Sequence, residues 1–309
     1  MNWKTKAAIM RLFAALSYGD RIYKAGQKRF GRLAARPMTR LPKQAQMIRW
    51  LRDAGRSVEG MRFFELGTGH VPLVPIGFYL CGADKVLTVD LNRRIDWNLT
   101  RDSLYWISKH REDVWALYNR LVPEAVFNVR FAVLARLADD PPCFLDAAGI
   151  DYKAPMNAAD TRLADHSIDC CFSMTTLEHI RPKDIRDIFV EAKRILNKGG
   201  TSLHFVDMSD HFQHQDTSIS RINFLQYSER QWQRIAGNEF AYCNRMRVSD
   251  YVKIFDELGY KIERQENIVD QEAVIALREG KLKIDPAFSG YDQADLCSTS
   301  LRVLLGLKS

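Results

Sequence analysis

Acidic and histidine side chains are concentrated in one short polar segment, Asp207–Asp216 (DMSDHFQHQD). Carboxylates and imidazoles at this spacing can take a proton from a nucleophile, or they can hold a divalent metal ion. His211 is the first candidate for a general base, because it follows an acid, Asp210, and precedes Phe212. His214 is the second candidate, and Asp210 completes the proposed catalytic group. We assign no metal ligand in this segment. Two alternatives remain: these residues hold a metal ion, or they only form hydrogen bonds to the backbone of their own loop.

A second group of residues could bind a nucleotide-like ligand. Apolar residues 61–66 are followed by the turn Gly67-Thr68-Gly69, and residues 72–81 predict a buried helix. Residues 85–89 predict a second strand, with Asp90 at its carboxyl end. This order is a βαβ unit of about the usual ~30 residues. In such units a ligand binds outside the carboxyl ends of the strands, where glycines let the backbone come close.

The elements that must position these residues alternate between strand and helix. A helix is expected after Pro182, because Ile185, Ile188, Phe189, Ala192 and Ile195 share one face, and Lys198-Gly199-Gly200 is a typical stop. A helix is also expected over 249–258. Further strands are predicted over residues 151–157, 168–174, 201–206, 260–264 and 301–307. The pattern predicts an α/β fold with a Rossmann-like seven-stranded, mostly parallel sheet and helices on both faces.

Two regions depart from this alternation. Residues 96–148 predict a helical insertion after the second strand. Residues 1–58 predict a basic helical extension that precedes a domain spanning 59–309. Within residues 1–43, eleven Lys/Arg stand against one acid, a net +10, so the rest of the chain carries −3 of the total +7. The extension could be a solvated cap, a lid over the site, or a contact with an anionic membrane or a phosphorylated substrate.

Composition limits the class of protein. Hydrophobic residues make up 46% and charged residues 27% of the chain, as in ordinary globular proteins. No apolar run approaches the ~20 residues of a membrane span, and no signal core precedes a cleavage site. We therefore expect a cytoplasmic protein, with peripheral contact at the inner membrane surface as an option. Six cysteines without a C-x-x-C pair are expected to be mostly buried free thiols. No nucleic-acid recognition motif accompanies the charge.

Four pieces of sequence occur together in a familiar order. They are ELGTG at 65–69, TVDLN at 88–92, DHSIDCCFSMTTLEHI at 165–180 and AKRILNKGG at 192–200. In this order they resemble the class I S-adenosylmethionine-dependent methyltransferases, over about residues 61–265. The third glycine usual in that family is absent, since His70-Val71-Pro72 follows Gly69. LEHI, DMSDHF and NRMRVSDY also resemble a bacterial subgroup associated with surface-glycan or lipid modification.

The resemblance implies S-adenosylmethionine as cofactor and a set of residues that hold it. Backbone N–H groups of the glycine turn and the acid Glu65 suit the amino-acid end of the cofactor. Asp90 suits both ribose hydroxyls, and Asp160 suits the adenine amine. The full set is Glu65, Gly67, Thr68, Gly69, Asp90, Leu91, Asp160, Thr161, Ser173 and Met174. A nicotinamide or flavin fold also places an acid ~20 residues after the turn, but it gives the Lys-Gly-Gly turn no role.

The expected activity is O-methylation of a hydroxyl on a small-molecule, glycan-like or lipid-linked acceptor. An N- or C-methyltransferase is one alternative, and a catalytically inactive cofactor-binding scaffold is another. The expected partners are this acceptor and, through the basic N-terminus, an anionic membrane, with no nucleic acid. The sequence does not predict an oligomeric state.

Overall fold

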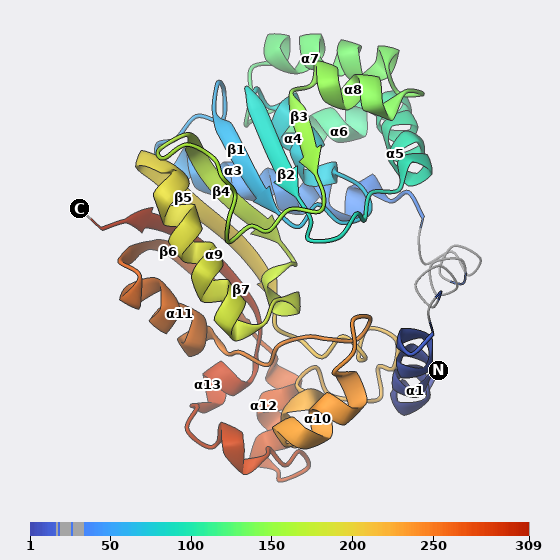
Figure 1. Ribbon diagram of the computed structural model, residues 1–309, viewed down its shortest axis with the longest axis vertical. Helices are drawn as coiled ribbons and strands as arrows, with labels where there is room; N and C mark the ends of the chain where they lie inside the picture. The colour runs from blue at the N-terminus through green and yellow to red at the C-terminus, as the bar shows by residue number, and fades with distance from the viewer. Residues whose placement is uncertain (17, 19–25, 27–33, 309) are drawn as a thin grey trace.

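One seven-stranded sheet forms the centre of the protein (Figure 1). The computed structural model describes residues 1–16, 18, 26 and 34–308. The strand order is β3-β2-β1-β4-β5-β7-β6, and only β7 runs antiparallel to its neighbours. The strands are β1 Arg62–Leu66, β2 Lys85–Val89, β3 Ile150–Lys153, β4 Ile168–Met174, β5 Leu196–Asp207, β6 Tyr260–Val269 and β7 Ser298–Leu307. The predicted Rossmann-like α/β class is confirmed.

Helices cover both faces of the sheet because neighbouring strand residues point to opposite sides. Phe63 packs in one core with α3 (Leu41–Asp53) and α4 (Leu73–Leu80). Phe64 packs in a second core with α9 (Pro182–Ile195) and α11 (Val248–Glu257). The five apolar residues that predicted one face of α9 are all buried in this second core.

The segment between β2 and β3 is helical, as predicted. Its helices are α5 Trp97–Lys109, α6 Arg111–Tyr118, α7 Glu124–Arg136 and α8 Pro141–Ala147. Asp96 caps α5 by accepting a hydrogen bond from the Leu99 amide, and Arg130 of α7 donates to the Ala83 carbonyl at 2.8 Å. The insertion therefore extends the core above α3 and α4.

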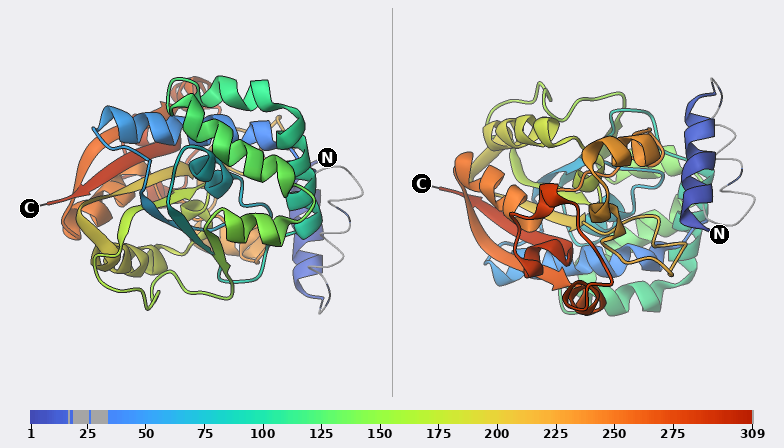
Figure 2. Two further views of the ribbon diagram at one scale, coloured as in Figure 1. Left: turned by 90° about the horizontal axis from the view of Figure 1, so that it is seen from above. Right: turned by 90° about the horizontal axis from the view of Figure 1, so that it is seen from below.

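A third, smaller core lies beyond the carboxyl ends of the strands (Figure 2). It joins α1 (Trp3–Ala14) to α10 (Glu229–Ala236), α12 (Gln271–Arg278) and α13 (Gln293–Leu296). Trp3 is buried against Phe212, and its amide donates to Asp216 at 2.8 Å. Part of the predicted basic extension, residues 17, 19–25 and 27–33, lies outside the described residues.

Several element bounds differ from the sequence-based ones. β3 ends at Lys153 instead of residue 157, close to Pro155, which has no amide hydrogen for a ladder. β5 begins at Leu196, so the Lys-Gly-Gly turn belongs to the strand. All six cysteines are free, and only Cys143 is exposed. Among the described residues, no helix combines the length and the hydropathy that crossing a membrane requires.

Candidate active site

The glycine turn after β1 brings backbone close to the end of β2. Gly67 has φ +85°, and a Cβ there would lie 2.4 Å from the Thr176 side chain, so only glycine fits. Gly69 has φ +72° with no heavy atom within 4 Å of its Cβ position, which leaves open space beside the turn. The Gly69 amide donates a hydrogen bond to Asp90 Oδ1 at 3.3 Å. The turn therefore combines a donor-rich backbone with a carboxylate.

Asp90 is held in place as an acceptor. Its Oδ2 accepts from the Tyr152 hydroxyl at 3.1 Å, and its side chain is mostly buried. Burial raises the pKa of Asp90 to about 6, although the hydrogen bonds from Gly69 and Tyr152 lower it in part. Leu91, directly after it, is 68% exposed and offers apolar surface at the same edge. A carboxylate in these surroundings can accept hydrogen bonds from two neighbouring hydroxyl groups of a ligand.

Glu65 is more deeply buried than the sequence indicated. Its carboxyl is 2% exposed and accepts a hydrogen bond from the Thr88 hydroxyl, which also contacts Thr68. Burial raises the pKa of Glu65 to about 8, with Asp90 adding to the effect and Thr88 and Arg40 opposing it. Glu65 thus supports the turn from beneath through the two threonines.

Arg40, which sequence reasoning missed, reaches the same place from the segment before α3. Its guanidinium donates to Thr175 Oγ1 at 2.6 Å, just after β4. Its charge lowers the pKa of both Glu65 and Glu178, so it stands between the ends of β1 and β4. No local motif marks this arginine, because only the packing of α3 on the core brings it here.

The other predicted cofactor residues lie in varied surroundings. Asp160 is exposed and lies 3.8 Å from Arg162. The Thr161 amide and hydroxyl both donate to Glu191 of α9. Ser173 is buried inside the sheet, where its hydroxyl bonds to His204 at 2.8 Å. The structure therefore brings Glu65, the turn and Asp90 together, and it places Asp160, Thr161 and Ser173 in other contacts.

A cavity of about 260 Å³ opens at the carboxyl ends of β4 and β5 and the amino end of the antiparallel β7. Met174, Asp207, Ser209 and His214 are among its lining residues. The Asp207 carboxylate accepts from the Ser209 hydroxyl at 2.6 Å and lies 3.6 Å from His214 Nε2. Ser209 gives its one hydrogen to Asp207, so its 3.2 Å contact with His214 Nε2 requires the imidazole to donate. In the neutral tautomer of His214, the hydrogen is therefore on Nε2 and the lone pair is on Nδ1.

His211 and Asp210 face other surroundings than His214. His211 stacks on the ring of His214 and meets the ring of His179 edge-on, and burial with a further effect of His179 lowers its pKa to about 3. Asp210 is fully buried and accepts from the Asn223 side chain at 2.9 Å and from the Phe212 amide. Among the described residues, His214 is the histidine that lines the cavity.

Glu178 is a buried carboxyl with unusual surroundings. It is 1% exposed, and neither of its carboxyl oxygens has a hydrogen-bond partner. Burial, with the nearby Asp207 charge, raises the pKa of Glu178 well above the ordinary value. The LEHI segment therefore places a buried carboxyl with a raised pKa beside His179.

Comparison with known proteins adds a family match over part of the chain. Residues 142–203, from α8 to β5, match the family model described as a methyltransferase domain. No curated protein matches the chain.

Solved structures resemble the chain at low identity. An S-adenosylmethionine-dependent methyltransferase from Mesorhizobium loti is 16% identical, with 83% of this chain and 95% of that one covered and a TM-score of 0.44. A putative sarcosine dimethylglycine methyltransferase from Galdieria sulphuraria is 13% identical, with 86% and 85% covered and a TM-score of 0.47. Phosphoethanolamine N-methyltransferase 2 from Haemonchus contortus, in complex with S-adenosyl-L-methionine, is 16% identical, with 85% and 52% covered and a TM-score of 0.45.

The residues at the turn fit S-adenosylmethionine. Open space beside Gly69, a carboxylate at Asp90 for the ribose and a cation at Arg40 for the amino-acid carboxylate match its polar ends. When bound, the cofactor supplies a methyl group on a sulfonium, already activated for in-line displacement. The domain match over residues 142–203, together with the sheet order and this turn, supports a methyltransferase activity with S-adenosylmethionine as cofactor.

Proposed function

We propose that the protein methylates a hydroxyl group on an acceptor that binds in the cavity at the ends of β4, β5 and β7. The observation that carries this proposal is the pair Asp207–His214 in the cavity wall, where the Nε2 hydrogen of His214 is directed to Ser209 and Nδ1 is the nitrogen left to take a proton. A hydroxyl is a weak nucleophile until a base removes its proton, and a positioned histidine is the usual base. An amine acceptor depends less on a base that removes its proton.

The chain's own part in the reaction is positioning and proton removal. Asp207 is fixed by Ser209 and faces His214 with its other oxygen, so it can stabilise the ring after the ring takes a proton. His214 Nδ1 would take the proton of the acceptor hydroxyl, while bound S-adenosylmethionine would supply the methyl group and leave as S-adenosylhomocysteine. The cavity walls hold the acceptor in line, which supplies much of the rate.

The charge of the cavity supports an anionic acceptor. Lys43, Arg221 and Arg302 line it, against one carboxylate, Asp207. Arg302 also lies 3.6 Å from Glu266, a residue that does not line the cavity. Arginine and lysine side chains around a hydroxyl-binding cavity suit a phosphate or carboxylate on the same molecule. A phosphorylated glycan or lipid-linked acceptor carries both groups.

A mass-shift screen tests the proposal. Purified protein is incubated with cell extract and S-adenosylmethionine carrying a trideuterated methyl group. We expect anionic, hydroxyl-bearing molecules to gain one labelled methyl group on oxygen. Phosphatase treatment of the extract should remove the signal if the anion is a phosphate. Label found only on nitrogen or carbon of the products would overturn O-methylation, and label on cationic acceptors alone would overturn the anionic acceptor.

We also propose a peripheral contact between α1 and an anionic membrane. Trp3, Ala7 and Met10 pack into the third core, whereas Leu12 and Leu16 are exposed beyond it, near Arg11. A short helix that keeps apolar and basic side chains outside the core suits the surface of an anionic bilayer. Such a contact would bring the cavity near a lipid-linked acceptor.

A further inference from the structure

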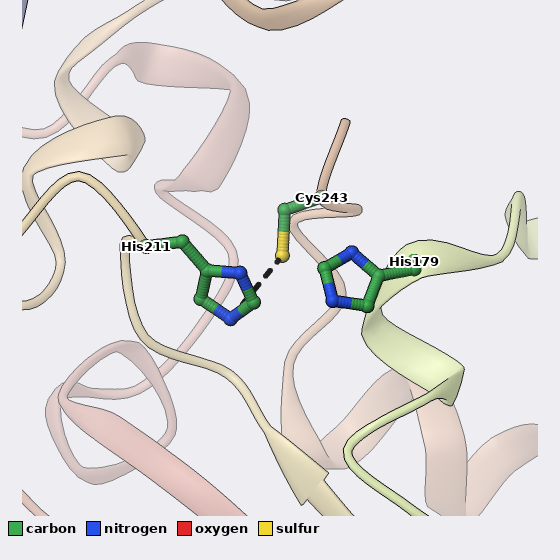
Figure 3. A group of neighbouring side chains, drawn as sticks. All are labelled: His179, His211 and Cys243. Atoms are coloured by element: carbon green, nitrogen blue, oxygen red, sulfur yellow. Dashed lines mark hydrogen bonds between the residues drawn. The ribbon is translucent and has the colours of Figure 1, made fainter. Parts of the chain in front are cut away.

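The side chains of three residues with metal-binding atoms point toward one another (Figure 3). His179 comes from the short helix η2 (Leu177–His179) after β4, and His211 from the loop after β5. Cys243 comes from the loop between α10 and α11. One ligand atom of each lies within 4.8 Å of the other two. Residues from three distant parts of the chain thus meet at one point.

His179 already has the hydrogen-bond arrangement of a metal ligand. Its Nδ1 lies 3.0 Å from the Tyr242 carbonyl oxygen. A carbonyl can only accept, so Nδ1 carries the hydrogen and Nε2 keeps a lone pair. Metal-binding histidines commonly donate their second nitrogen to a carbonyl in this way, which fixes the tautomer and the ring orientation.

His211 and Cys243 complete a set of borderline and soft donors. His211 Nε2 lies 4.0 Å from Cys243 Sγ, and the Cys243 thiol is 4% exposed and unpaired with another cysteine. The Asp207 carboxylate lies 3.7 Å from His211 Nε2 and brings negative charge beside them. His179 is on the exposed side of the group, so an ion can enter from solvent.

We propose that His179, His211 and Cys243 bind a divalent transition-metal ion of the zinc class, with one coordination position left open. Two imidazoles and a thiolate select zinc, cobalt or nickel over magnesium or calcium, which prefer oxygen. Ligand atoms around tetrahedral zinc are about 3.5 Å apart, so small side-chain rotations close the group around the ion. Three protein ligands and an open fourth position are typical of catalytic zinc sites.

The ion would stand next to the acceptor cavity. Asp207 lies between the two parts, 3.7 Å from His211 and 3.6 Å from His214. Because Asp207 also lines the cavity, the ion would lie one residue away from a bound acceptor. This inference concerns binding of the ion alone, so it holds or fails independently of the methylated atom.

Cobalt titration without cofactor tests the site. Tag-free full-length protein is stripped with a chelator and titrated with Co²⁺. We expect one equivalent to bind, with a thiolate-to-cobalt charge-transfer absorption that Zn²⁺ abolishes by displacement. Cys243→Ser should lose this absorption, and His179→Gln and His211→Gln should each weaken binding at least tenfold. Circular dichroism verifies that each variant is folded.

Matched controls come from the same residue types elsewhere. Cys143 is an exposed free thiol, and His110 stacks on Trp106 in the insertion. Cys143→Ser and His110→Gln should bind Co²⁺ as the unmodified protein does. The proposal is overturned if the unmodified protein shows no charge-transfer absorption, or if Cys243→Ser keeps it while Cys143→Ser loses it.

Discussion

The Arg40 guanidinium donates a hydrogen bond to the Thr175 hydroxyl at 2.6 Å, across 135 positions of sequence. This contact ties the segment before α3 to the end of β4, beside the glycine turn. It places a permanent cation where the carboxylate of the cofactor's amino-acid end is expected. We therefore expect the N-terminal part of the chain to contribute to the cofactor site.

We expect Arg40→Ala to weaken binding of S-adenosylhomocysteine about tenfold, because a charge-assisted hydrogen bond contributes roughly 1.5–3 kcal/mol. Arg40→Lys should restore part of the affinity. Isothermal titration calorimetry measures the dissociation constants. Arg101→Ala serves as the control, since Arg101 lies on α5 and pairs only with exposed Asp102. Equal affinities for Arg40→Ala and Arg101→Ala would contradict the assignment.

Asp90 should make cofactor affinity depend on pH. Its pKa of about 6 means that the carboxyl becomes protonated below that pH and stops accepting from ribose hydroxyls. We expect affinity for S-adenosylhomocysteine to be constant above pH 7 and to fall up to about tenfold per pH unit below pH 6. Asp90→Asn should bind weakly with little pH dependence. A pH-independent affinity in the unmodified protein would reject Asp90 as the ribose acceptor.

The same raised pKa has an opposite consequence for stability without cofactor. Between the ordinary value of 3.8 and about 6, the folded chain holds more protons at Asp90 than the unfolded chain does. The contribution of Asp90 to the free energy of unfolding therefore falls as pH rises through this window. Asp90→Asn should remove this decrease, which denaturant titrations at several pH values can follow.

His214→Ala should lower turnover about 10²–10⁴-fold while leaving cofactor affinity unchanged, because it removes the base and no cofactor contact. Turnover is measured with the acceptor that the mass-shift screen identifies. His211 stays the base that sequence order alone favours, so His211→Ala is measured in parallel. A larger loss of turnover in metal-free His211→Ala than in metal-free His214→Ala would reverse the assignment of the base.

Leu12→Ser combined with Leu16→Ser should reduce pelleting of the full-length protein with vesicles rich in phosphatidylserine. Both leucines are exposed, so the substitutions remove apolar surface without affecting the third core. Val129→Ser on α7 is the matched control, because Val129 is similarly exposed. Pelleting should also weaken with salt. If the double variant and the control pellet equally, α1 is not the membrane contact.

Local patterns predicted the elements that carry their own signals. The buried runs of β1, β2, β4 and β5, the glycine turn and the amphipathic face of α9 are all present. Asp90 lies beside Gly69 because a parallel βαβ unit brings its strand ends together.

Contacts between distant segments could not be predicted in the same way. Thr161 follows β3 as expected, yet its amide and its hydroxyl both donate hydrogen bonds to Glu191 on α9. Arg40, Glu178 and Cys243 reach the site only through packing of separate elements. His211 and His214 are three residues apart and stack on each other, yet His214 lines the cavity whereas His211 also contacts His179.

The position of β7 between β5 and β6 also orders events during synthesis. β6 pairs only with β7 among the described strands, and Thr299, Ser300 and Arg302 of β7 line the acceptor cavity. A ribosome releases residues 298–307 after every other strand. The glycine turn and Asp90 can therefore assemble on a nascent chain. The acceptor cavity is complete only when β7 has paired with β5 and β6. The cofactor turn is thus built between β1 and β2 alone, whereas the acceptor cavity also needs residues of β7.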